Sequence, residues 1–100
     1  SHMPIIYRFK WNDVDVVIKY KPKTFEVYER NYGTPLSHIE VDCEQPLPIT
    51  ETGYRSHYIA NDALLAYGGA LEFVKAWLEE EAQKPDWKTS QAKRQQLSLF

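Results

Sequence analysis

The sequence predicts an α+β fold: an antiparallel β-meander of about four strands, covered by one main C-terminal helix and followed by a disordered tail. Three observations predict it. The N-terminal half contains runs in which apolar and polar residues alternate, the period of a strand. A later segment carries apolar residues at helical spacing, and residues 88–96 contain no large apolar residue.

The first two runs predict a β-hairpin. Residues 5–11 alternate, with the isoleucine and aromatic side chains of Ile5, Tyr7, Phe9 and Trp11 on one face. Residues 14–20 alternate again, with Val14, Val16, Ile18 and Tyr20 on one face. Asn12 and Asp13 stand between the runs and favour a tight two-residue turn.

Two further strands are expected before the prolines at 46 and 48. Residues 24–30 are rich in Phe, Val and Tyr, which predicts a third strand. Residues 32–35 are predicted to form a loop. Residues 37–44 alternate, with Ile39, Val41 and Cys43 inward. The connections are short, so a meander is the simplest topology.

The second half predicts loops and helices. Residues 50–58 are polar with no clear period, which predicts a compact loop. Residues 61–67 fit a short helical turn, and residues 70–84 a helix that Pro85 ends. We expect its apolar stripe to lie on the sheet, with Trp77 and Leu78 against the face of Val14, Val16 and Ile18.

The length of 100 residues suits one domain. Residues 1–3 resemble the remnant of a cleaved tag, residues 4–87 form the expected domain, and residues 88–100 a flexible tail. The single cysteine, the absence of a membrane-length apolar run and the absence of a visible signal peptide predict a cytoplasmic protein. Twelve basic and fourteen acidic side chains argue against a protein that grips nucleic acid mainly by charge.

One group of residues in the expected loop is a candidate ligand site: Glu51, Tyr54, Arg55, Ser56, His57 and Tyr58. An arginine can hold a phosphate or carboxylate, a histidine can move a proton near neutral pH, and tyrosines can stack on a base. The structural alternative is a folded turn in which Glu51 pairs with Arg55 and the tyrosines pack on the helix.

The chain ends in apolar residues beyond a polar segment. Leu97, Leu99 and Phe100 have no core within reach, so we expect them to enter a pocket on another protein. Gln96 can donate and accept hydrogen bonds and so fix the register of such a peptide. The alternative is that the tail packs on its own domain.

The last five residues, Gln96-Leu97-Ser98-Leu99-Phe100, resemble the motif that binds the bacterial sliding clamp, the polymerase III beta subunit. The resemblance implies that Gln96 orients the peptide, Leu97 fills a small subsite, and Leu99 with Phe100 fills the main apolar pocket. It implies the clamp as partner and a role in DNA replication. Residues 38–78 resemble small uncharacterised proteins of bacterial plasmids and mobile elements, which brings no activity with it.

Together these features predict a small non-enzymatic adaptor that docks on the clamp. A nucleic-acid-binding module is the alternative, using residues 54–58 and the basic side chains of the hairpin region: Arg8, Lys10, Lys19, Lys21 and Lys23. A small enzyme centred on Glu51, Arg55 and His57 is a third candidate, although no motif assigns a catalytic residue or a reaction. We expect no cofactor and no metal, because Cys43, His38 and His57 lack zinc-ligand spacing.

Overall fold

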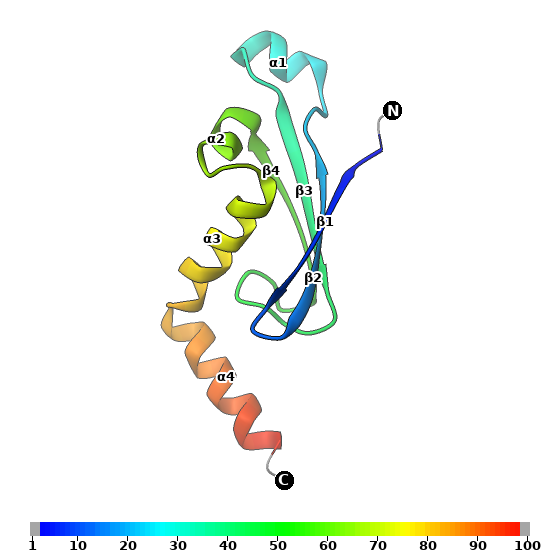
Figure 1. The fold of residues 1–100 in the computed structure, drawn as a ribbon. Helices are drawn as coiled ribbons and strands as arrows, with labels where there is room; N and C mark the ends of the chain where they lie inside the picture. Colours follow the sequence, from blue (N-terminus) through cyan, green and yellow to red (C-terminus); the bar gives the residue numbers. More distant parts are fainter. Residues whose placement is uncertain (1–2, 99–100) are drawn as a thin grey trace.

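The computed structural model describes residues 3–98 and has an α+β fold, as predicted. Four strands form one antiparallel sheet in the order β1-β2-β3-β4, with helix α3 across one face and helix α4 extending away from it (Figure 1). The elements are β1 Ile5–Trp11, β2 Val14–Lys21, α1 Glu26–Tyr32, β3 Leu36–Cys43, β4 Tyr54–Ala60, α2 Asn61–Ala66, α3 Ala70–Ala82 and α4 Pro85–Ser98. None of the helices in residues 3–98 combines the length and the apolar character needed to cross a bilayer.

The predicted N-terminal hairpin is confirmed. Asn12 and Asp13 both adopt positive φ, at 46° and 66°. This is the backbone of a two-residue turn whose twist matches that of the strands, and Asn and Asp tolerate it best after glycine. Trp11 then pairs with Val14, and the register continues to Ile5 opposite Tyr20.

The predicted third strand at residues 24–30 is wrong. Glu26–Tyr32 forms the short helix α1, which connects β2 to β3. Gly33 ends it at φ 75° and donates its N–H to the carbonyl of Glu29 at 2.8 Å, a left-handed C-cap. Val27 is 57% exposed, so the apolar residues that suggested a strand are not part of the core.

The fourth strand lies where the sequence predicts a loop. β4 pairs with β3 from Leu36 opposite Ala60 to Asp42 opposite Tyr54. The turn before it depends on Gly53, whose φ is 90° and whose Cα lies so near Cys43 that a Cβ would stand 2.5 Å from the Cys43 carbonyl oxygen. Only glycine fits this close approach.

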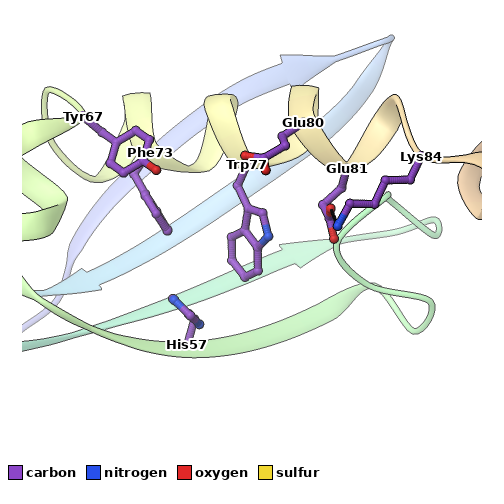
Figure 2. Close-up of a pocket in the computed structure, with 7 residues that line it drawn as sticks. All are labelled: His57, Tyr67, Phe73, Trp77, Glu80, Glu81 and Lys84. Carbon is purple, nitrogen blue, oxygen red and sulfur yellow. Dashed lines mark ion pairs between the residues drawn. The ribbon is translucent and has the colours of Figure 1, made fainter.

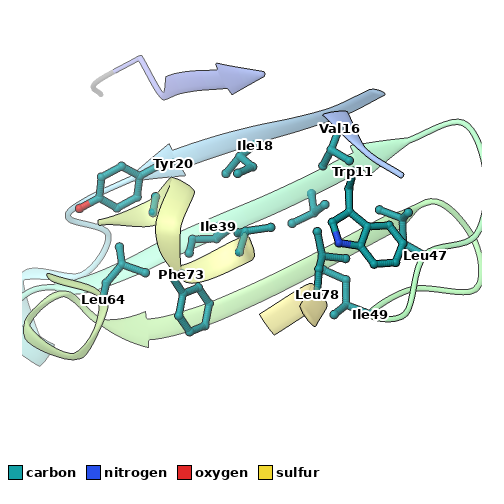
Figure 3. Close-up of a cluster of buried hydrophobic side chains, with 13 residues drawn as sticks. Trp11, Val16, Ile18, Tyr20, Ile39, Leu47, Ile49, Leu64, Phe73 and Leu78 are labelled. Atoms are coloured by element: carbon teal, nitrogen blue, oxygen red, sulfur yellow. The ribbon is translucent and has the colours of Figure 1, made fainter. Parts of the chain in front are cut away.

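The core lies between the inner face of the sheet and helix α3 (Figure 3). Val16, Ile18, Ile39 and Val41 come from the sheet, and Leu78 from the helix; all five are buried. Leu78 is therefore buried, as predicted, in the cluster that contains Val16 and Ile18.

Trp77 differs from the prediction, because it is only half-buried and lies against β4 rather than β2. One helical position separates it from Leu78, a rotation of about 100° around the helix axis. That rotation carries its ring to the side of the sheet where β4 runs. Its neighbours there are His57 and Arg55.

Helix α3 ends at Ala82, and Pro85 begins helix α4 instead of ending helical structure. Proline fits the first turn of a helix, where its missing N–H has no intrahelical partner to lose. Residues 88–98, predicted to be disordered, are helical and rich in the good helix formers Lys, Gln, Ala and Arg. Trp87 anchors the helix by an edge contact with Trp11 at 6.1 Å between ring centroids.

Candidate functional site

The residues of the candidate ligand loop divide between two faces of the sheet. Tyr54–Tyr58 is strand rather than loop, and successive side chains of a strand point to opposite faces. Tyr54, Ser56 and Tyr58 lie on the face that α3 leaves open, because they pair with Asp42, Glu40 and His38. Arg55 and His57 lie on the face toward α3, opposite Val41 and Ile39. The predicted single ligand loop is therefore wrong, and Glu51 remains in the turn before the strand.

A polar network joins β3 and β4 on the open face. The Nε2 of His38 lies 2.6 Å from the Oγ of Ser56, and its Nδ1 lies 3.8 Å from a carboxylate oxygen of Glu40. The Tyr54 hydroxyl donates to the other Glu40 oxygen at 2.9 Å. This hydrogen bond to a carboxylate is the main cause that raises the pKa of Tyr54.

Ser56, His38 and Glu40 stand in the order of nucleophile, base and acid in a hydrolytic triad. The 3.8 Å between His38 and Glu40 exceeds hydrogen-bond distance, so the carboxylate does not hold the imidazole as a triad requires. The three side chains lie on the pleated surface of the sheet. The network fixes the orientation of His38 and Tyr54 and assigns no reaction.

Aromatic and basic side chains share the open face. Tyr58 stacks on His38 with ring centroids 4.4 Å apart, and Phe25 lies 6.2 Å from its ring. The strand register places four exposed basic side chains of the hairpin on the same face: Arg8, Lys10, Lys19 and Lys21. Lys10 lies 4.0 Å from the carboxylate of Asp15, and Lys23 pairs with Glu29 at 2.7 Å, so neither is a free cation.

On the opposite face, β4 meets α3 through aromatic contacts. His57 lies 4.8 Å from Trp77 and 5.9 Å from Phe73 between ring centroids. The Arg55 guanidinium lies 5.3 Å from the Trp77 ring and donates to the Ile49 carbonyl at 3.4 Å. Within the described residues Arg55 has no ion pair with Glu51.

A cavity of about 300 Å³ opens beside His57 (Figure 2). Its walls are the rings of His57, Tyr67, Phe73 and Trp77 and the charged side chains of Glu80, Glu81 and Lys84. Glu81 and Lys84 form an ion pair with each other. Burial lowers the pKa of His57, and the positive charge of Arg55 lowers it further; both effects favour the neutral imidazole.

The aromatic wall of this cavity could not be predicted, because the sequence pattern identifies Tyr67, Phe73 and Trp77 only as helix residues. The division of 54–58 between two faces could have been found from the alternation of Tyr54, Ser56 and Tyr58 with Arg55 and His57. The residues on both faces of this run carry hydroxyl, imidazole or guanidinium groups. The two faces therefore differ little in hydrophobicity, and the period of a strand is hard to recognise.

Cys43 lies on the inner face of the sheet, as predicted, and packs against the core. Cys43 is half-buried, its Sγ donates to the Gln45 carbonyl at 3.1 Å, and burial raises the pKa of its thiol. Across residues 3–98, no three His, Cys, Asp or Glu side chains gather closely enough to hold a metal ion.

Gln96 and Leu97 lie in the last turn of α4, at the end of the helix away from the sheet (Figure 1). Leu97 is 73% exposed, and Gln96 is exposed as well. The side chain of Ser98, and Leu99 and Phe100 entirely, lie outside the described residues.

Residues 4–87 match the family described as the KlcB third domain. This chain belongs to that family. The KlcB third domain thus comprises the whole sheet together with α1, α2 and α3, and the match ends at Trp87 in the first turn of α4. Both faces of β4 lie within the KlcB third domain, whereas residues 96–100, which resemble the clamp-binding motif, lie beyond it. No curated protein and no solved structure is significantly similar to the chain.

Proposed function

We propose that this protein is a non-enzymatic adaptor that docks on the bacterial sliding clamp through residues 96–100. The observation that carries the proposal is Leu97, a large apolar side chain left 73% exposed at the end of a polar helix. A single leucine exposed to water is common on protein surfaces and costs little free energy. Leu97, however, belongs to a five-residue motif that ends in two further apolar residues. Such a group fits a pocket on a partner.

The position of the motif supports this role. α4 leads away from the sheet, and the motif begins at Gln96, beyond the residues that match the KlcB third domain. A partner as large as a clamp could therefore reach the motif without meeting the domain. The last carbonyls of a helix lack intrahelical partners, so the end of α4 can change conformation on binding at small cost.

The motif assigns each residue a part. Gln96 would set the register by hydrogen bonds, Leu97 would fill a small subsite, and Leu99 with Phe100 would supply most of the apolar contact. Membership of the KlcB third domain family fits a small plasmid-associated protein, so we place this adaptor on a mobile element. There it would recruit the clamp of its host or compete with other proteins that bind it.

A retention experiment tests the proposal. Immobilised bacterial clamp should retain the full chain and should not retain a Leu99→Ala, Phe100→Ala double variant. The double variant should melt at the same temperature as the wild type, because both residues lie outside the KlcB third domain. Ser98→Asp should be retained, because the resembling motif accepts either residue. Equal retention of wild type and double variant would reject the proposal.

Nucleic-acid binding is the second candidate, and one observation favours it: Tyr54 and Tyr58 share the open face with the basic hairpin residues. Stacking side chains beside cations suit a single strand. Glu40 and Asp42 on the intervening strand count against tight binding. Fluorescence anisotropy with a labelled single-stranded 20-mer tests it, because a Lys19→Glu, Lys21→Glu variant should bind more weakly and Lys23→Glu should not.

A further inference from the structure

Strand β4 has one free edge, and its hydrogen-bonding groups can be assigned residue by residue. The Cys43 N–H donates to the Gly53 carbonyl and the Asn61 N–H to the Pro35 carbonyl, both at 2.8 Å. Antiparallel bonding alternates, so Arg55, His57 and Ile59 bond to β3. The residues between them point their N–H and C=O groups away from the sheet.

The protein protects the beginning of this edge. The Thr50 hydroxyl donates to the Tyr54 carbonyl at 2.7 Å and accepts from the Tyr54 N–H at 3.2 Å. The Thr52 hydroxyl also donates to the Tyr54 carbonyl, at 3.3 Å. At the other end, Ala60 passes directly into α2. Side chains that cover an edge in this way prevent strand addition where they stand.

Ser56 and Tyr58 are left with open backbone groups. Among the described residues, neither backbone has a hydrogen-bond partner on the free edge. Two N–H and two C=O groups therefore face outward at a spacing that matches one extended strand. Such a set is complementary to the backbone of a peptide and to little else.

The aromatic cavity lies on the His57 side of this edge. In an antiparallel pairing, the incoming residue opposite His57 would place its side chain on the same face of the sheet as His57. That face holds the cavity of about 300 Å³ between β4 and α3, with Trp77 and Phe73 in its wall. The volume is at the lower end for ligand pockets, which suits one side chain rather than a cofactor.

We propose that residues 56–58 of β4 bind an extended peptide from another protein as a fifth strand, with one leucine- or phenylalanine-sized side chain in the aromatic cavity. Rings form most of the wall, which favours an apolar side chain. Arg55 over Trp77 disfavours a cationic one, and Glu80 disfavours an anionic one. This site is independent of the C-terminal motif and of the open face, so it does not depend on clamp or nucleic-acid binding.

The probe is a displayed library of random octapeptides selected on the full chain, with the best binder then made synthetically. We expect the selected peptides to share one central Leu, Ile or Phe. In NMR titration, the synthetic peptide should shift the amide signals of Ser56 and Tyr58 and the indole signal of Trp77. Failure to enrich any peptide would overturn the proposal, as would shifts confined to other surfaces.

A matched pair of variants tests the backbone contact. Ser56→Pro removes the outward N–H and leaves the bonds to β3, because proline is tolerated on the free side of an edge strand. Ser56→Ala loses the same contact with His38 and keeps the N–H. We expect Ser56→Pro to weaken peptide binding at least tenfold and Ser56→Ala less than twofold. Equal affinity for the two variants would overturn the proposal.

The cavity wall offers a second test that does not depend on folding of the proline variant. Tyr67 is about half exposed and lies outside the buried core, so Tyr67→Ser should leave the melting temperature within a few degrees. This substitution should weaken the binding of a selected peptide with a central Phe about tenfold. It should leave the affinity for the same peptide with a central Gly unchanged. Equal affinity of wild type and Tyr67→Ser for the Phe peptide would contradict this placement.

Discussion

The guanidinium of Arg55 lies 5.3 Å above the ring of Trp77 and so joins strand β4 to helix α3. The same guanidinium donates to the Ile49 carbonyl at 3.4 Å, which connects it to the turn before the strand. A residue that the sequence offers as a ligand for phosphate thus serves as a contact between two elements of the domain.

Arg55→Ala should lower the free energy of unfolding by about 0.5–1 kcal/mol, the value of a cation–π contact at an exposed site. Arg55→Lys should lower it less, because the cation over the ring is kept. Chemical denaturation of both variants measures the difference. A loss above about 3 kcal/mol for the alanine variant would show that the contact is a structural anchor and not a surface interaction.

Leu78→Ala should destabilise the domain more than Trp77→Ala, although tryptophan is the larger side chain. Leu78 is fully buried between α3 and the sheet, and its removal leaves a cavity that costs about 2–5 kcal/mol. Trp77 is half-buried at the side of the helix. Denaturant unfolding ranks the two, and a larger loss for Trp77→Ala would place the centre of the core on the β4 side.

The low pKa of His57 predicts how stability depends on pH. Its pKa in the folded state lies below the value of about 6.5 in the unfolded chain, so between the two the unfolded state binds more protons. The free energy of unfolding therefore falls as the pH drops from 7 through this window. Melting curves at pH 7.5 and 5.5 should show a smaller decrease for His57→Gln than for the wild type. An equal decrease in the two proteins would show that His57 does not contribute to the pH dependence of stability.

Thr50→Val tests the protection of the β4 edge. The change keeps the shape of a buried side chain and removes the hydroxyl that satisfies both backbone groups of Tyr54. Tyr54 is 45% exposed and keeps its longer hydrogen bonds to Thr52, so the loss should be about 1 kcal/mol, the net value of a typical hydrogen bond. We expect that loss in denaturation, together with concentration-dependent association through the longer open edge, measured by light scattering.

Thr52→Val is the control for that experiment, since Thr52 is exposed and its bonds to Tyr54 are longer, at 3.3 Å. It should cost less than about 0.5 kcal/mol and leave the chain monodisperse. If both threonine variants behave alike, the hydroxyl of Thr50 does not protect the edge.

The sequence predicted the elements in which alternation is clear and failed where polar residues occupy a strand. The first hairpin and β3 are recognisable because Val, Ile and aromatic residues alternate with charged ones. β4 is concealed because two of its three inward positions hold Arg55 and His57, and only Ile59 is aliphatic. Aromatic content made α1 resemble a strand, although its side chains are largely exposed.

The candidate site was predictable as a group of residues and not as an arrangement. The alternation of Tyr54 and Arg55 places them on opposite faces only if 54–60 is a strand, and the hydrophobic contrast along this run is too weak to identify the strand. The cavity beside His57 depends on the packing of α3, a contact between segments far apart in the chain. Residues 96–100, by contrast, are a short linear motif, which can be read from sequence without the fold.

Calorimetric titration of purified bacterial sliding clamp with the full chain measures directly whether residues 96–100 dock on the clamp. A short anchor that must be ordered on binding predicts a Kd of roughly 1–10 µM, about −7 to −8 kcal/mol. Binding should be saturable and should disappear in the Leu99→Ala, Phe100→Ala variant. If no saturable heat is seen up to millimolar concentration, or if the double variant binds with unchanged affinity, the protein does not dock on the clamp through these residues.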